Sequence, residues 1–167
     1  MASTLLNFDA LAFDGDTVPV TAGDLAAYFD NINGRSVLVF IDGADESAAV
    51  TRAVQMPQQY AAGALAAKLC IFTAATTGSV VWEVYVEAVT DADASDMDTG
   101  ALFDSANSGT VAVPGTAGYL DVFSITLTNK DSVAAGDLVR FLVRRNSPSG
   151  SDDAAANAYL MWLAIEE

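Results

Sequence analysis

The stretch VVWEVYVEAV, residues 80–89, decides the fold class of this chain. Two sets of side chains alternate along it with a period of two, which is the period of a β-strand that buries one face. One set is apolar and the other is mostly acidic: Trp82, Val84, Val86 and Ala88 against Glu83, Tyr85 and Glu87. The pattern therefore predicts a half-buried strand.

Two further segments show the same alternation. In residues 138–145, Val139, Phe141 and Val143 oppose Arg140 and Arg144, and in residues 120–128, Phe123, Ile125 and Leu127 oppose Val122, Ser124 and Thr126. Strands are also expected over 36–41, 48–55 and 65–75, with a weaker one near 101–103 or 110–113. TTGS at 76–79 is expected to form a hairpin turn in which Gly78 supplies a positive φ.

The segment AYLMWLAIEE, residues 158–167, is apolar on both faces. Strict alternation places Tyr159, Met161, Leu163 and Ile165 on one side, with Leu160 and Trp162 on the other. Such a strand is either central in a sandwich or covered by a neighbouring subunit.

About eight short strands with glycine-rich and aspartate-rich connections predict an all-β fold, a jelly-roll β-sandwich of antiparallel strands over residues 35–167. Residues 1–34 are interpreted as an N-terminal arm. Within it, Thr21 as N-cap and the spacing of Leu25, Tyr28 and Phe29 favour one short helix at about 21–31. The apolar arm needs a surface to lie on, either its own sandwich or another subunit.

Composition restricts the partners. Seven basic and twenty-two acidic side chains give a net charge of -15, which repels phosphate backbones and anionic lipids, so neither nucleic acid nor a membrane is expected as a partner. No apolar run approaches the roughly 18 residues that cross a bilayer, so we expect a soluble chain. The single cysteine, Cys70, lies in an apolar run and is interpreted as a buried side chain.

Catalytic chemistry has little support in the sequence. The chain has no histidine, which excludes a Ser-His-Asp arrangement and histidine metal sites. Glu83 and Glu87 are interpreted as the polar face of a strand rather than a catalytic pair, although a glycosidase needs only two carboxylates. Arg140, Arg144 and Arg145 are expected to pair with aspartates rather than with a phosphate. We therefore expect a protein that is not an enzyme and has no cofactor.

The acidic stretch DADASDMDTG, residues 91–100, fails the EF-hand pattern. That pattern requires glycine at the sixth position and glutamate at the twelfth, and counting from Asp91 gives Asp96 and Leu102. A solvated loop is the favoured interpretation, with an irregular calcium site as the alternative. Its ligands would be Asp91, Asp93, Asp96 and Asp98.

A set of short motifs follows in a fixed order between residues 82 and 145. They are a strand ending in WEVYVEAV, the acidic loop, FDSANS, PGTAGY, ITLTN, DSVAAGD and a basic segment at 138–145. In this order they resemble small virion structural proteins of tailed bacteriophages. The resemblance implies a jelly-roll sandwich and a place on the particle, without a catalytic residue.

The expected function is that of a capsid cement or decoration protein on the capsid surface of a virion. Its partners would be the major capsid protein and further copies of itself, as a trimer or dimer. The candidate interface residues are Leu5, Leu6, Phe8, Leu11, Phe13, Leu160 and Trp162. The alternative is a tail or fibre module that binds a receptor or carbohydrate, for which Trp82, Tyr85, Tyr119, Tyr159 and Trp162 would supply stacking surfaces.

Overall fold

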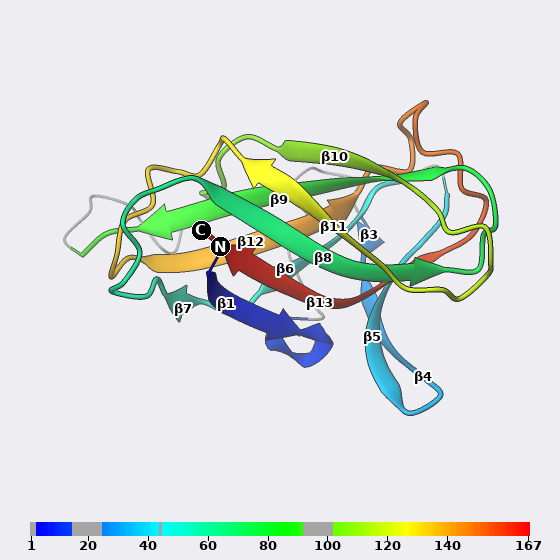
Figure 1. Cartoon of the computed structure of the whole chain (residues 1–167), viewed down its shortest axis with the longest axis horizontal. Helices are drawn as coiled ribbons and strands as arrows, with labels where there is room; N and C mark the ends of the chain where they lie inside the picture. The colour runs from blue at the N-terminus through cyan, green and yellow to red at the C-terminus, as the bar shows by residue number, and fades with distance from the viewer. Residues whose placement is uncertain (1–2, 15–24, 44, 92–101) are drawn as a thin grey trace.

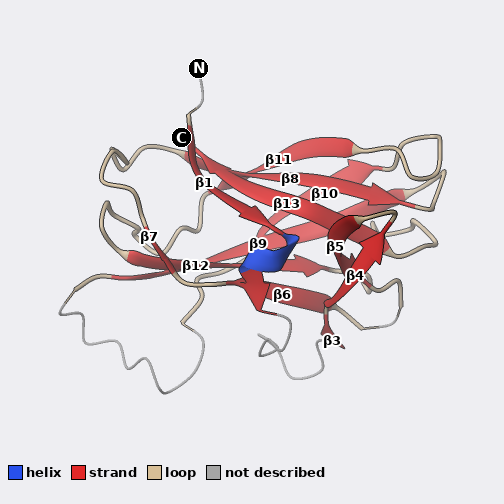
Figure 2. Ribbon diagram, turned by 90° about the horizontal axis from the view of Figure 1, so that it is seen from below, coloured by secondary structure: helices blue, strands red, loops and turns tan. Residues whose placement is uncertain are grey.

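The computed structural model folds the chain into two mainly antiparallel sheets packed face to face (Figures 1 and 2). It describes residues 3–14, 25–43, 45–91 and 102–167. Sheet A contains β1 (Thr4–Asp9), β4 (Tyr28–Ile32), β5 (Arg35–Phe40), β8 (Leu65–Thr73), β11 (Asp121–Leu127) and β13 (Ala158–Glu166). Sheet B contains β2 (Phe13–Asp14), β3 (Leu25–Ala26), β6 (Ser47–Thr51), β7 (Val54–Gln55), β9 (Ser79–Val89), β10 (Asn107–Ala112) and β12 (Leu138–Arg145). One 3₁₀ turn, η1 (Ala10–Ala12), joins β1 to β2.

Eight strands follow the jelly-roll order, which confirms the predicted fold class. Counted along the chain as β5, β6, β8, β9, β10, β11, β12 and β13, they divide between the sheets in the order β11-β8-β13-β5 and β10-β9-β12-β6. The first and last strands are therefore neighbours, as are the second and seventh. Consecutive strands often lie in different sheets, and this makes the fold rich in long-range contacts.

The prediction of a hairpin at residues 76–79 is wrong, because β8 belongs to sheet A and β9 to sheet B. The segment is a turn that crosses from one sheet to the other. Gly78 does adopt the expected positive φ, 92°. A Cβ there would come within 2.7 Å of the carbonyl oxygen of Asp153, so glycine is required for space as well as for conformation.

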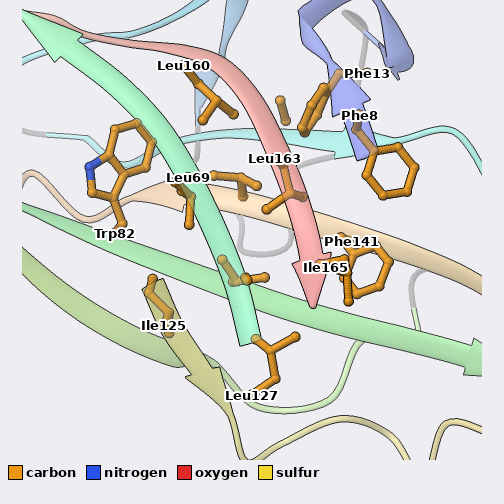
Figure 3. Close-up of a cluster of buried hydrophobic side chains, with 14 of the residues drawn as sticks. Phe8, Phe13, Leu69, Trp82, Ile125, Leu127, Phe141, Leu160, Leu163 and Ile165 are labelled. Atoms are coloured by element: carbon orange, nitrogen blue, oxygen red, sulfur yellow. The ribbon is translucent and has the colours of Figure 1, made fainter. Parts of the chain in front are cut away.

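The core between the sheets contains the apolar halves of the alternating strands (Figure 3). Trp82 is fully buried and meets Phe40 edge to face, with ring centroids 4.8 Å apart. Phe8 packs against Phe141 at 5.8 Å. The inward sets predicted for residues 80–89, 120–128 and 138–145 all contribute to this core.

In β13 the predicted division of faces is wrong. A β-bulge between Leu160 and Trp162 inserts one residue and shifts the alternation. Leu160, Leu163 and Ile165 therefore all point into the core, as Figure 3 shows. Tyr159 and Trp162 lie outside this core.

The predicted helix at about 21–31 is also wrong in its described part, because Leu25–Ala26 and Tyr28–Ile32 are strands β3 and β4. Residues 15–24 lie outside the described residues. The rest of the N-terminal segment lies on its own sandwich: β1 pairs with β13 and β2 pairs with β6. Strand β4 pairs with β5 in a hairpin that projects beyond the body of the molecule (Figure 1).

Candidate functional site

The outer face of sheet B is covered by the chain itself. Phe103 and Ala106 pack over Tyr85 and Leu142, which form a small second core on that face. Two hydrogen bonds join the covering segment to β9: the Leu102 amide donates to Glu87 Oε2 at 3.0 Å and the Asp104 amide to the Val86 carbonyl oxygen at 2.9 Å. Strand β9 is consequently buried on both faces, and the prediction of a half-buried strand is wrong for its acidic side.

The carboxylates beneath this cover are bound by arginines. Arg144 donates from Nε to Glu83 Oε2 at 2.8 Å and also pairs with Glu46, while its guanidinium lies 5.1 Å from the centre of the Tyr85 ring. Arg140 forms two hydrogen bonds with Glu87, at 2.8 and 2.6 Å. Both glutamates therefore serve in ion pairs beneath the cover of sheet B, each accepting charge-assisted hydrogen bonds from an arginine.

The surroundings of Glu83 shift three pKa values. Burial alone would raise the pKa of the Glu83 carboxyl, but hydrogen bonds from Asn146 and Arg144 and the Arg144 charge outweigh it and lower this pKa below its usual value. Burial and the Glu83 charge raise the pKa of Tyr85. Burial would lower the pKa of Arg144, yet its bonds to Glu83 raise it. Glu83 and Arg144 are therefore charged at neutral pH.

Arg145 faces the end of the core and is fully buried. It binds Asp152 at 2.7 Å and Asp42 at 3.2 Å, and it donates to the carbonyl oxygens of Ala154 and Ala156. The expectation that Arg140, Arg144 and Arg145 pair with aspartates is thus met for Arg145, whereas glutamates bind the other two.

The outer face of sheet A differs, because apolar side chains there reach solvent. Strand register places Val122, Cys70 and Trp162 in one row, and Phe72, Tyr159, Val39 and Tyr28 in a second row. Cys70 and Val39 are buried beneath their neighbours, and the other side chains of the two rows are partly or fully exposed. Leu120 is 59% exposed, Tyr28 46% and Val122 45%. We call the surface formed by Tyr28, Phe72, Leu120, Val122, Tyr159, Met161 and Trp162 the apolar face.

A cleft of about 330 Å³ opens on this apolar face beside the bulge of β13. It arises because β5 pairs with β13 only at residues 158–160, while β1 pairs with it at 162–166. The β4–β5 hairpin separates from the sheet between these two pairings. The lining comes from the hairpin (Ile32, Asn33 and Arg35), from β8 and β13 (Phe72 and Met161) and from the segment before β11 (Gly118 and Leu120).

Most predicted interface residues lie elsewhere. Leu5, Phe8, Phe13 and Leu160 are buried in the chain's own core, and Leu6 packs against that core. Because these side chains stabilise the sandwich, they are not exposed for a partner. Leu11 is 58% exposed, and Trp162 on the apolar face is partly exposed, as is Leu6.

The proposed calcium ligands fall largely outside the described residues. Asp91 is exposed, and Asp93, Asp96 and Asp98 are not described. Within residues 3–14, 25–43, 45–91 and 102–167, no three aspartate, glutamate or cysteine side chains gather closely enough to hold a metal ion. In the same ranges, no helix has the length and apolar character needed to cross a membrane.

Sequence reasoning missed Arg35, Phe72, Leu120 and Met161 as members of one site. A signal existed for the hairpin, since Asn33-Gly34 between two strands is typical of a two-residue turn, and these residues adopt φ values of 53° and 80°. A second signal was Val122, an apolar residue on the otherwise polar side of its strand. The bulge at Met161 has no comparable mark in the sequence.

Comparisons with known proteins found no matching family model and no matching curated protein. Among solved structures, the chain is similar to a family 6 carbohydrate-binding module of Cellvibrio mixtus lichenase 5A, solved with cellotriose, at 12% identity over 99% of this chain and 98% of that one, with a TM-score of 0.46. It is also similar to the C-terminal module of LamC, a laminarinase of Zobellia galactanivorans, at 13% identity over 97% and 98%, with a TM-score of 0.45. An exo-β-1,3-galactanase of Phanerochaete chrysosporium matches at 14% identity over 98% of this chain and 29% of that one, also at 0.45. The function therefore has to be inferred from the chain's own surface.

Proposed function

We propose that this chain is a non-enzymatic structural domain that binds a larger protein assembly through its apolar face. The assembly would be the head of a tailed bacteriophage, with the chain acting as a cement or decoration protein on the capsid surface and the major capsid protein as its partner. This rests on the resemblance of its motifs to small virion proteins together with the surface described above.

The observation that carries the proposal is the contrast in cover between the two outer faces. A contiguous apolar surface on a soluble domain indicates an interaction site. The chain covers the corresponding face of sheet B with its own residues 102–106, whereas Leu120 and Val122 on sheet A remain exposed. The net charge of -15 would keep such a domain soluble before assembly.

The location can be tested by antibody labelling of purified virions, with the copy number from quantitative mass spectrometry. Hundreds of copies on the head would support the proposal, whereas a handful at the tail would contradict it. Sedimentation of the free protein would test the expected dimer or trimer.

The role of the surface is tested by Val122→Asp, which places a charge in the apolar face. Thr110→Asp is the matched control, since Thr110 is exposed on β10 of sheet B. We expect Val122→Asp to abolish capsid occupancy and Thr110→Asp to leave it unchanged. Equal occupancy by both variants would contradict docking through this face.

A second candidate, glycan binding, is favoured by the cleft, which combines the aromatic ring of Phe72 with the polar groups of Asn33 and Arg35. Titration with neutral glucans and galactans, followed by amide NMR, tests it. Saturable shifts at Gly34 and Gly118 would support glycan binding, and their absence would remove this candidate.

A further inference from the structure

One basic side chain differs from the other six of this acidic chain. Five of the seven reach a carboxylate: Arg52, Lys68, Arg140, Arg144 and Arg145. Lys130 is bound by the Tyr60 hydroxyl and by the carbonyl oxygens of Ala62 and Gly63. Arg35 makes only a long contact, 3.4 Å, to the Asn33 carbonyl oxygen, and no carboxylate of the described residues lies within ion-pair distance of it.

Arg35 also lines the cleft of the apolar face, together with Asn33. The rest of the lining is largely apolar and includes the side chains of Leu120 and Met161. Phe72 also lines it and lies on β8, the strand between β11 and β13. A guanidinium presents paired donors that match a carboxylate, and such charge-assisted hydrogen bonds are stronger than neutral ones. The occupant that complements this lining therefore has an anionic group beside an apolar body.

We infer that the cleft binds a carboxylate-bearing segment of the protein partner, an aspartate or glutamate side chain next to an apolar side chain. The inference rests on the proposed function, because it assigns the partner's chemistry at the same apolar face. The carboxylate would bind Arg35, and the adjacent apolar side chain would pack on Leu120 and Met161.

The lining favours a peptide over an acidic sugar. Sugars bind proteins by laying their apolar faces on open aromatic rings, whereas the Phe72 ring stacks on Tyr159 with centroids 4.7 Å apart and planes 13° apart. One face of Phe72 is thus already occupied. The remaining apolar contacts come from Ile32, Leu120 and Met161, which suit a side chain.

The test is an amide NMR titration at about 0.15 M salt, where charges beyond roughly 8 Å are screened. The probes are N-acetyl-aspartyl-leucinamide, its asparaginyl counterpart and glucuronic acid. We expect saturable shifts at Gly34, Arg35 and Gly118 with the aspartyl peptide, and affinity weaker by about tenfold for the asparaginyl peptide. Equal binding of both peptides, binding of glucuronic acid alone, or no shift at these residues would overturn the inference.

Arg35→Gln should weaken binding of the aspartyl peptide by the same factor, about tenfold, and leave binding of the asparaginyl peptide unchanged. Arg52→Gln is the matched control, because it removes the same charge from an exposed pair with Asp14. Failure of the inference is separable from failure of the proposed function. If the chain binds the peptide but is absent from the capsid, only the proposed function is contradicted. If capsid binding is lost in Val122→Asp but survives Arg35→Gln, only the inference about the cleft is contradicted.

Discussion

On the outer face of sheet B, the described arginines Arg140 and Arg144 are each bound to a glutamate, and residues 102–106 of the chain lie over them. On the outer face of sheet A, Leu120 and Val122 are exposed, and Phe72, Tyr159 and Trp162 are partly exposed. One face is thus closed, with its arginines paired, whereas the other carries an apolar patch that is partly open. A chain that closes one face with its own residues leaves the other as the surface on which a partner would bury apolar area.

The largest effect is expected from Arg144→Met on the closed face. The substitution leaves the buried Glu83 without its main charge partner, which costs about 3–5 kcal/mol of unfolding free energy. In a domain of this size we expect the melting temperature to fall by about 10 °C. Urea denaturation and differential scanning calorimetry would measure both quantities.

Arg52→Met is the control for that substitution. Its ion pair with Asp14 has an N···O distance of 3.6 Å and is largely exposed on both sides. An exposed pair contributes about 0–1 kcal/mol. Equal losses in the two variants would show that the Glu83 pair is no more important than a surface pair.

Acid should weaken the same closed face. The folded pKa of Glu83 lies below its unfolded value of about 4.3, so its contribution is complete above that pH and is lost as the pH falls through the folded pKa. Glu83→Gln should lower stability by about 2 kcal/mol at pH 7, and the gap to the natural chain should narrow below about pH 4. Urea unfolding from pH 7 to pH 3 would measure this, and a constant gap would contradict the ion-pair account.

Two valines compare the faces directly. Val50 is buried under the cover of sheet B, whereas Val122 is 45% exposed on sheet A. Val→Thr keeps the side-chain shape and replaces a methyl group by a hydroxyl. A buried hydroxyl without a partner lowers the free energy of unfolding by about 1–3 kcal/mol, whereas a surface substitution changes it by no more than about 0.5 kcal/mol. In thermal unfolding, Val50→Thr should therefore lower the melting temperature more than Val122→Thr does. A larger loss for Val122→Thr would mean that the apolar face is the covered one.

Alternation in the sequence was sufficient to predict the fold class and most of the core, because the faces of β9, β11 and β12 follow strictly from a period of two. It could not show that Glu83 and Glu87 are buried, since the cover comes from residues distant in the sequence. The helix predicted near Tyr28 and Phe29 failed because the turn at Asn33-Gly34 lets this segment pair with β5, and that pairing outweighed the helical spacing.

The candidate site was less accessible to prediction than the fold. It forms where the bulge at Met161 lets the hairpin separate from β13, and one inserted residue leaves no pattern in an apolar run. Most of the arm residues proposed as an interface are instead core, because an apolar arm packs on its own sandwich when β13 offers a free edge. Strict alternation grouped Trp162 with Leu160 on one face, whereas the bulge places Leu160 in the core and Trp162 on the apolar face.

The smallest expected effect concerns the reaction rate of the Cys70 thiol, which lies just beneath the side chains of the apolar face. Cys70 lies between Val122 and Trp162 and is 3% exposed, and burial together with the charge of Asp121 raises its pKa. Its thiol should therefore react slowly with a disulfide reagent at pH 8, because little thiolate is present. Val122→Ala should speed the reaction several-fold by thinning the cover, whereas Val50→Ala on the other face should not. If further copies of the chain cover this face, the rate of the natural chain should fall as its concentration rises. A rate that depends on neither Val122 nor concentration would show that Cys70 is shielded by the sandwich itself rather than by the side chains of an open docking surface.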